Sequence, residues 1–273
     1  MATINYAAKY SDLVDERFTQ ASITSPAFSE MFDWSGANTV NVYSLGTSAM
    51  RDYNMTGMQR YGNPDELSDT LQTMILSQDR AFTYTIDRRN YADTMMVREV
   101  GRSLRRQLDE VVIPEVDIYR LKVLTDKAGT TVEEVITEDN AYSAFIDAVV
   151  TIRGNNAPLV GTVAYISANF FKSIRLDKSF IKSGDISQSM LINGQVGTIE
   201  GIPVITVPFG YLPEGVEFLV TNRIAATSPQ KIDTFQVHQT PQGVNGWLVE
   251  GRIYHDAFVL NNKANAIYVH KTP

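Results

Sequence analysis

The chain has 273 residues, of which 44% are hydrophobic and 20% charged, and this is the composition of a folded protein, not of a disordered or collagen-like one. Its formal net charge of −7 excludes a uniformly basic nucleic-acid-binding surface, so we expect any contact with DNA to be local and weak. The absence of cysteine excludes disulfides, thiolate zinc sites and cysteine nucleophiles. Apolar runs are too short for a membrane helix of about 20 residues, and we expect no membrane partner.

The first 37 residues are polar and only weakly periodic. Ser11–Phe18 has the pattern of a short helix with Ser11 as its N-cap. Its few apolar residues cannot form a core of their own. We interpret residues 1–37 as an N-terminal arm that lies on another part of the structure or on another molecule.

Residues 38–89 carry strand patterns at their two ends. Thr39–Leu45 alternates apolar and polar residues, and so do Thr73–Leu76 and Arg80–Asp87. The residues between, 46–69, are rich in Gly, Asn, Asp, Ser, Met and Arg. A long two-stranded hairpin that projects from the body accounts for this pattern. Because an isolated hairpin is marginally stable in water, we expect a neighbouring molecule to hold it.

A long amphipathic helix is predicted over residues 90–125. Its apolar stripe has helical spacing and consists of Val97, Val100, Leu104, Leu108 and Val111. Pro114 predicts either a kink or the start of a second helix, after which Val116, Tyr119 and Val123 resume the stripe. A helix of this length approaches about 50 Å, which is typical of an extended subunit.

The remaining residues predict a mixed α+β arrangement. One helix is expected to begin at Asp139 as N-cap and to end at Gly154, and a second is expected over Ala168–Leu176 with Ser167 as N-cap. The predicted strands are Val163–Ile166, a pair joined by a glycine turn within Gly197–Pro208, Glu217–Thr221, Gln236–Gln239, Gly246–Leu260 and Ala266–His270.

The sequence contains none of the common phosphate-loop, dinucleotide, zinc-protease or nucleophile-elbow motifs. The only imidazoles are those of His238, His255 and His270. The pair His255–Asp256 could be half of a catalytic arrangement, but neighbours in a strand point to opposite faces and would not orient each other. The adjacent carboxylates Asp65–Glu66 and Glu133–Glu134 are interpreted as solvated loop residues. We therefore expect no catalytic residue, no cofactor and no metal.

The arginines of the predicted helix have three interpretations: a solvated face, salt bridges to neighbouring subunits, or contact with nucleic acid phosphate. The loop arginines favour contacts with a partner, because guanidinium forms directional bidentate pairs, and the loop methionines suit an adaptable surface. The residues expected to contact other subunits are Arg17, Phe18, Arg51, Met55, Met58, Arg60, Arg80, Arg88, Arg89, Arg102, Arg105 and Arg106.

Several segments, taken in order, resemble those of the major capsid proteins of tailed bacteriophages, which have the Hong Kong 97-type fold that encapsulin shells share. Residues 1–28 resemble the N-terminal arm of these proteins, and Val40–Ser44 with Asp79–Arg88 resemble the two strands of their extended loop. The further similar segments are the spine helix Leu104–Asp117, the strand pair Gly194–Pro208 and the closing strands Arg252–Leu260 and Ile267–Val269.

The resemblance implies a subunit with five parts. They are an arm at 1–37, an extended loop at 38–89, a peripheral domain at 90–158 with the spine helix 90–125, an axial domain at 159–223, and closing strands at 224–273 that return to the peripheral domain. Some relatives cross-link subunits through a loop lysine. Here no lysine lies between Lys9 and Lys122, so a loop-lysine isopeptide bond is excluded and stability must be non-covalent or come from a decoration protein.

The resemblance implies a structural protein that assembles into the icosahedral head of a tailed phage around double-stranded DNA. The expected partners are further copies in hexamers and pentamers, a portal, scaffolding or decoration proteins, and DNA through weak non-specific contact. The expected location is the virion, with assembly in the bacterial cytoplasm. The alternatives are an encapsulin-like shell with protein cargo, a hydrolase using His255 and Asp256, and a monomeric tail or carbohydrate-binding module.

Overall fold

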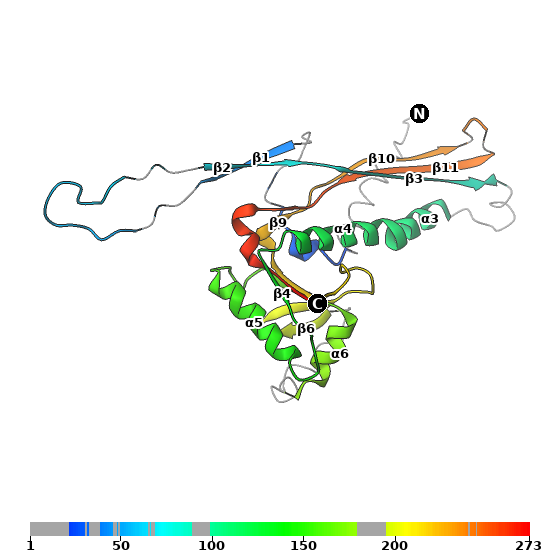
Figure 1. Cartoon of the computed structure of the whole chain (residues 1–273). Coiled ribbons are helices and arrows are strands. Elements are labelled where there is room, and N and C mark those ends of the chain that lie inside the picture. Colours follow the sequence, from blue (N-terminus) through cyan, green and yellow to red (C-terminus); the bar gives the residue numbers. More distant parts are fainter. Residues whose placement is uncertain are drawn as a thin grey trace. The chain divides into compact units, whose positions relative to one another are not determined.

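The computed structural model describes residues 22–30, 32, 39–45, 48, 50–64, 66, 69–88, 99–178, 195–239, 241–243 and 245–273. The chain divides into two compact units, drawn in Figure 1. The body consists of Met1–Asp33 and Ser77–Pro273, and the loop unit consists of Trp34–Leu76. The predicted helix Ser11–Phe18, with Arg17 and Phe18, and also Arg89 lie outside the described residues.

The centre of the body is a six-stranded mixed sheet with the order β4-β13-β8-β5-β7-β6. Its middle strand β5 has every residue buried, as expected of a strand that is covered on both faces. The strands are β4 Thr130–Glu133, β5 Thr162–Ile166, β6 Gln195–Ile199, β7 Ile202–Thr206, β8 Val216–Asn222 and β13 Ile267–Lys271. All but β4 were predicted from alternation, with bounds that differ by one to a few residues.

Helices cover the two faces of this sheet. Along β5, Val163 and Tyr165 pack with Leu121 and Leu124 of α4 (Ile113–Asp126). The intervening residues of β5 pack on the opposite face with α5 (Ala141–Gly154) and α6 (Ala168–Leu176). Figure 1 shows α5 and α6 on the side of the sheet away from α4. The alternation of side chains along one strand therefore joins two apolar layers into one body.

The ends of α5 and α6 test the predicted caps. Ser167 is the N-cap of α6, where its hydroxyl accepts a hydrogen bond from the Phe170 amide at 3.0 Å, so that prediction is confirmed. The prediction that Asp139 is the N-cap of α5 was wrong, because the N-cap of that helix is Asn140. The Asn140 side chain does not cap the helix. It binds the Thr137 amide at 2.7 Å instead and closes the preceding turn.

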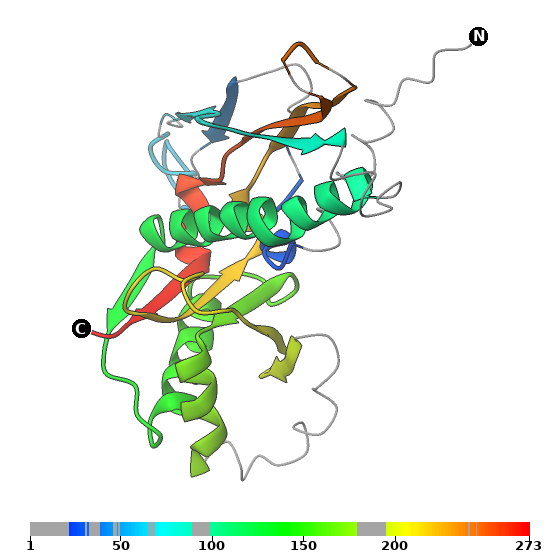
Figure 2. The same ribbon diagram turned by 90° about the vertical axis from the view of Figure 1, so that its right-hand side faces the viewer.

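A second, three-stranded antiparallel sheet has the order β10-β11-β3. It consists of β3 Gln78–Asp87, β10 Gln230–Gln239 and β11 Gly246–His255. One of its faces packs against the first part of the long helix, where Leu104, Leu108 and Val112 meet Val249 and Ile253. Figure 2 shows the long helix between this sheet and the rest of the body.

The long helix is continuous but not regular. It consists of α3 (Glu99–Gln107), a π-helical turn (Leu108–Val112) and α4, while residues 90–98 lie outside the described part. The prediction that Val111 continues the apolar stripe was wrong: Val111 is 46% exposed and Val112 only 8%. The wider π turn takes more residues to return to the same face. Pro114 lies in the first turn of α4, which agrees with the predicted start of a second helix.

Short elements complete the body. The two-stranded sheet β9-β12 pairs Ala226–Thr227 with Phe258–Val259, and Ser29 forms an isolated bridge to Thr227. Four short helical turns connect the larger elements: Ser25–Ala27, the π turn already described, Arg223–Ala225 and Asn261–Ala266. The chain before the loop unit is thus bound into the body at Ser25–Ser29.

The loop unit contains β1 (Thr39–Leu45) and β2 (Asp69–Ile75), which pair antiparallel from Thr39↔Ile75 to Leu45↔Asp69. A two-stranded loop was predicted, and β1 has the predicted bounds. The predicted partner was wrong: Asp79–Arg88 does not pair with β1, because β3 pairs with β11 in the body. The nearer strand β2 closes the hairpin with a shorter connection.

Candidate functional site: contact surfaces and a buried polar network

The tip of the loop unit, residues 50–64, is exposed throughout its described length apart from a half-buried Gly62. Its apolar side chains face solvent, with Met55 82% and Met58 98% exposed. Met50 and Tyr61 are exposed in the same way. Groups of exposed apolar side chains on a soluble protein mark sites of interaction, and methionine adapts to irregular partner surfaces. The predicted contact residues Met55 and Met58 therefore lie where a partner can reach them.

The tip has an ordered backbone despite this exposure. The Arg51 guanidinium donates to the Asn63 carbonyl oxygen at 2.6 Å, and the Asn54 amide donates to the Arg60 carbonyl oxygen at 2.9 Å. Gly62 has φ +83°, and a Cβ there would lie 2.9 Å from the Arg51 side chain. Arg51 and Arg60 were predicted as partner contacts. Both are exposed, and both side chains also form hydrogen bonds within the tip, Arg51 to Asn63 and Arg60 Nε to the Gly57 carbonyl oxygen at 3.4 Å.

The body arginines are divided between internal pairs and solvent. Arg80 pairs with Glu115, and Arg106 pairs with Glu110 at 2.7 Å, one helical turn away. Arg105 and Arg88 are exposed. The side chain of Arg102 lies outside the described part, although its backbone is in α3. The structure thus brings Arg80 and Arg106 to acidic groups of their own chain.

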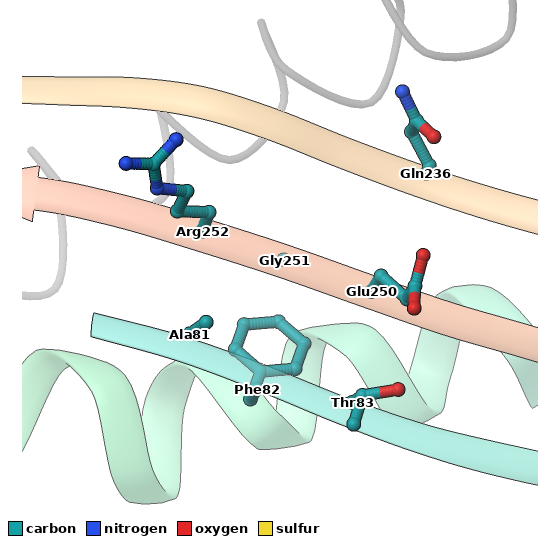
Figure 3. Close-up of a pocket in the computed structure, with 7 residues that line it drawn as sticks. All are labelled: Ala81, Phe82, Thr83, Gln236, Glu250, Gly251 and Arg252. Carbon is teal, nitrogen blue, oxygen red and sulfur yellow. The ribbon is translucent and has the colours of Figure 1, made fainter. Parts of the chain in front are cut away.

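The outer face of the three-stranded sheet carries a shallow groove, drawn in Figure 3. Gly251 pairs with Phe82 of β3. Arg252 at one end forms a bidentate pair with Asp79 through hydrogen bonds of 2.8 and 2.5 Å. The groove is lined by Ala81, Phe82, Thr83, Gln236, Glu250, Gly251 and Arg252.

Two charged residues of α4 are buried in the body. Asp117 is 1% and Arg120 is 4% exposed. Asp117 accepts hydrogen bonds from the Ser22 hydroxyl at 2.6 Å, from the Ile23 amide at 3.1 Å and from the Thr24 hydroxyl. We call Ser22, Thr24, Asp117 and Arg120 the arm anchor, because it fixes the described start of the chain to α4.

Arg120 satisfies its donors within the same region. One terminal nitrogen donates to the Ser22 and Thr24 hydroxyls at 3.2 Å each, and its Nε donates to the Ser228 hydroxyl at 2.7 Å. Its guanidinium also lies over the Phe28 ring, 5.3 Å from the centroid. Burial lowers the pKa of Arg120 to about 10, and the nearby Asp117 opposes this shift. The side chain therefore stays cationic at neutral pH.

Asp256 organises a second buried cluster. Its carboxylate accepts hydrogen bonds from the Ser77 amide and hydroxyl at 2.8 Å each, from the Tyr119 hydroxyl at 2.7 Å, and from the Ala257 amide at 2.8 Å. Burial, and then the hydrogen bond with Asp256, raises the pKa of the Tyr119 phenol. Four donors occupy the carboxylate, which is the arrangement of a structural acceptor rather than of a general base.

His255 precedes Asp256 but does not share its hydrogen bonds. Its ring is 3% exposed and contacts Tyr119 edge-to-face at 5.5 Å. Burial, together with Arg120, lowers the pKa of His255 to about 4. Its Nδ1 has no hydrogen-bond partner among the described residues. Within the described contacts, His255 and Asp256 do not form the catalytic pair that was considered from the sequence.

Sequence reasoning missed Asp117, Arg120, Ser77 and Ser228. A signal was present for the first two, because they lie three residues apart beside Val116 and Leu121, on the face of the helix that packs into the body. Charged residues on an apolar stripe are rarely fully buried unless they are paired. Neither Ser77 nor Ser228 carries a comparable local signal.

Other kinds of site receive no support from the part of the chain that the structure describes. No cluster of three or more His, Asp or Glu side chains suitable for a metal ion occurs there. None of the described helices is long and apolar enough to cross a membrane.

Several solved structures are similar to this chain over most of its length. A structure from Mycobacterium phage Che8 superimposes with a TM-score of 0.69 at 19% identity, covering 86% of this chain and 85% of that one. The head structure of Helicobacter pylori bacteriophage KHP40 gives 0.65 at 12% identity, covering 93% and 91%. The chain has the Hong Kong 97-type fold. Neither a family model nor a curated protein sequence matches it.

A virus-like particle from Pyrococcus furiosus superimposes on this chain with a TM-score of 0.60 at 9% identity, covering 98% of this chain and 100% of that one. At such identities the likeness establishes the fold. The arm anchor and the Asp256 cluster are features of this chain's own residues within that Hong Kong 97-type fold.

Proposed function

We propose that this chain is the major capsid protein of a tailed bacteriophage, the repeating subunit of an icosahedral head that encloses double-stranded DNA. The observation that carries the proposal is the whole-chain likeness to a phage head structure, which covers 93% of this chain and 91% of that one. A shared fold does not by itself imply a shared function. The exposed surfaces of this chain supply a second line of support.

The loop tip supports assembly because it has no apolar core of its own. Met55, Met58 and Tyr61 face solvent on a two-stranded unit, and a two-stranded hairpin alone is marginally stable. A neighbouring copy that covered these side chains would stabilise both molecules. Each such contact can be weak, because the many interfaces of one shell act together.

The division into five parts that was predicted from the sequence belongs to the same proposal. The arm at 1–37, the loop at 38–89, the peripheral domain at 90–158, the axial domain at 159–223 and the closing strands at 224–273 would build hexamers and pentamers. The structural loop unit is Trp34–Leu76, so β3 within the proposed loop would move with the body.

The partners follow from the same proposal. A portal, scaffolding or decoration proteins, and packaged DNA held by weak contacts would complete a virion assembled in the host cytoplasm. The contact residues Arg17, Phe18, Arg88, Arg89, Arg102 and Arg105 would face neighbouring subunits or DNA, while Arg80 and Arg106 would first have to leave their internal pairs. The role is structural rather than enzymatic.

Electron microscopy of the full-length protein after expression tests the proposal. Closed particles hundreds of ångströms across, the order of size of a shell built from many copies, are the expected result. A stable monomer at high concentration would overturn it. Removing residues 1–21 should prevent assembly while leaving a folded subunit. The deletion must stop before Ser22, because Ser22 and Thr24 belong to the arm anchor inside the body.

An encapsulin-like compartment with protein cargo is a second candidate, because encapsulin shells share the Hong Kong 97-type fold that this chain has. The content of purified particles separates the two: DNA that resists nuclease until the particles are opened supports the phage head, and a co-purifying enzyme supports the compartment. A hydrolase using His255 and Asp256 would lose its activity in His255→Ala with particle formation unchanged. We expect no activity that depends on His255.

A further inference from the structure

A continuous path of hydrogen bonds runs through the body from the arm anchor to the residue that follows the loop unit. At its first end Ser22 and Thr24 donate to Asp117 and accept from Arg120. At its other end lies Ser77, the first residue of the body after Leu76. One end of the network thus holds the described start of the chain, and the other end holds the residue that follows the loop unit.

Ser228 is the link between the two ends. Its hydroxyl accepts a hydrogen bond from Arg120 Nε at 2.7 Å and donates its own hydrogen to the backbone carbonyl oxygen of Asp256 at 2.8 Å. The Asp256 amide in turn donates to the Pro229 carbonyl oxygen at 3.2 Å. A hydroxyl has a single hydrogen, and here it is donated to Asp256 while the same oxygen accepts from Arg120, so the two hydrogen bonds meet at one atom.

The side chain of Asp256 then fixes Ser77. It accepts from both the amide and the hydroxyl of Ser77 at 2.8 Å, and from Tyr119 at 2.7 Å. Tyr119 lies between Asp117 and Arg120 in sequence, on the same helix α4. The helix therefore contributes side chains at both ends of the network, and among the described hydrogen bonds Ser228 is the link that joins Arg120 to Asp256.

We infer that this network couples the Ser22–Thr24 segment to Ser77, so that release of the arm anchor loosens the point where the chain returns from the loop unit. The coupling is a property of the single subunit. Its use in assembly rests on the proposed function, since there the arm and the loop would each contact other copies.

Loss of hydrogen bonds at the buried Asp117 explains why release of the arm anchor would affect the rest of the network. If Ser22–Thr24 left the body, Asp117 would lose three donors while it remained buried, and a buried charge without partners is strongly unfavourable. Arg120, whose Nη1 now lies 3.9 Å from Asp117 Oδ1, would compensate by turning toward that carboxylate and away from Ser228. Because coupling free energies are reciprocal, loosening of Ser77 would equally weaken the hold on the arm anchor.

Hydrogen exchange in the dispersed full-length subunit tests the coupling. The readout is the exchange rate of peptides that contain the Ser77 amide, relative to amides of β8 at the centre of the six-stranded sheet, which report global opening. Thr24→Val removes the hydroxyl and keeps the shape. It should speed exchange at Ser77, relative to β8, by at least about fivefold, the lower range for coupled sites.

The link variant Ser228→Ala decides whether the effect travels along this path. In that background Thr24→Val should have no additional effect at Ser77. Thr125→Val is the matched control, because Thr125 is a buried hydroxyl of the same helix that binds only the Leu121 carbonyl oxygen among the described contacts. It should leave the ratio of Ser77 exchange to β8 exchange unchanged.

Two results would overturn the inference: unchanged relative exchange at Ser77 in Thr24→Val, or an equal effect of Thr24→Val with and without Ser228. Thr24→Ser retains the hydroxyl and should show the same exchange as the original protein. This control separates the loss of the hydroxyl from a general effect of substitution at this position. Particle formation is measured separately. If no particles form but the exchange pattern is as expected, the proposed function fails and the coupling stands.

Discussion

The body buries its apolar side chains, whereas the tip of the loop unit exposes them. In the body, strands such as β5 are buried on both faces, between α4 on one side and α5 and α6 on the other. In the loop unit, the tip exposes Met50, Met55, Met58 and Tyr61. The body is stabilised by its own side-chain packing. The tip of the loop unit is held by hydrogen bonds, and its apolar side chains remain exposed to solvent.

Because of this difference, we expect substitutions in the two regions to affect different properties, namely the stability of the subunit and the assembly of copies. A substitution in the core of the body should change the free energy of unfolding of the single subunit, since most of the buried side chains lie there. A substitution at the loop tip should leave the free energy of unfolding unchanged and act only when copies meet. The predictions below test this division, beginning with the largest expected effect on the subunit.

Phe218→Ala should have the largest effect. The Phe218 ring is fully buried and contacts Phe145, Phe170 and Tyr268 with centroid distances between 4.6 and 6.0 Å. Loss of this ring leaves a cavity between the sheet and α5 and α6, and we expect a loss of about 4 kcal/mol in the free energy of unfolding. Urea unfolding of the dispersed subunit measures it. A loss below about 1 kcal/mol would mean that the body is not held by this core.

Asp117→Ala should follow, at about 3 kcal/mol, because it leaves Arg120 buried without its acidic partner. The double variant Asp117→Ala with Arg120→Met removes both charges and should recover part of the loss. Arg106→Ala is the surface control: its pair with Glu110 is exposed, and we expect a change within about 0.5 kcal/mol. An equal loss in Asp117→Ala and Arg106→Ala would contradict the buried anchor.

The stability of the body should also depend on pH through His255. Burial lowers its pKa to about 4, below the ordinary value of 6.5. Between these two values the unfolded chain binds a proton that the folded chain does not. The contribution of His255 to stability is therefore complete above about pH 6.5 and falls as the pH drops toward 4, by about 3 kcal/mol. Unfolding curves across this range should show a slope that His255→Leu reduces, and an unchanged slope would refute the assignment.

Local patterns explain how much of the body could be predicted from sequence. Ser167 followed by a helical segment predicted α6, and a tight glycine turn predicted the strand pair β6-β7; in the loop unit, alternation predicted β1. At that turn, Glu200 and Gly201 have φ values of 52° and 77°, which explains the glycine. Each of these signals lies within about a dozen residues, where local propensity and packing agree.

The rest depends on contacts between distant residues. The pairing of β3 with β11 joins Phe82 to Gly251, and no local pattern distinguishes that partner from β1. The π turn, which exposes Val111, and the hydrogen bond from Ser22 to Asp117 are likewise invisible to periodicity. For the candidate site, the sequence indicated that the arm and loop make contacts but not that a buried network lies between their attachment points.

Met58→Ser should have the smallest effect on the subunit and so gives the sharpest test of the division between the two units. Met58 is 98% exposed, so its replacement removes no buried contact, and we expect a change within about 0.5 kcal/mol in the free energy of unfolding. If a neighbouring copy covers the tip, the yield of closed particles should nonetheless fall, and combining Met58→Ser with Met55→Ser should lower it further. Urea unfolding and particle counts from the same preparation measure both quantities. Normal particles from the double variant would mean that another surface drives assembly, whereas a large loss of stability in the dispersed subunit would mean that the tip is packed within its own molecule.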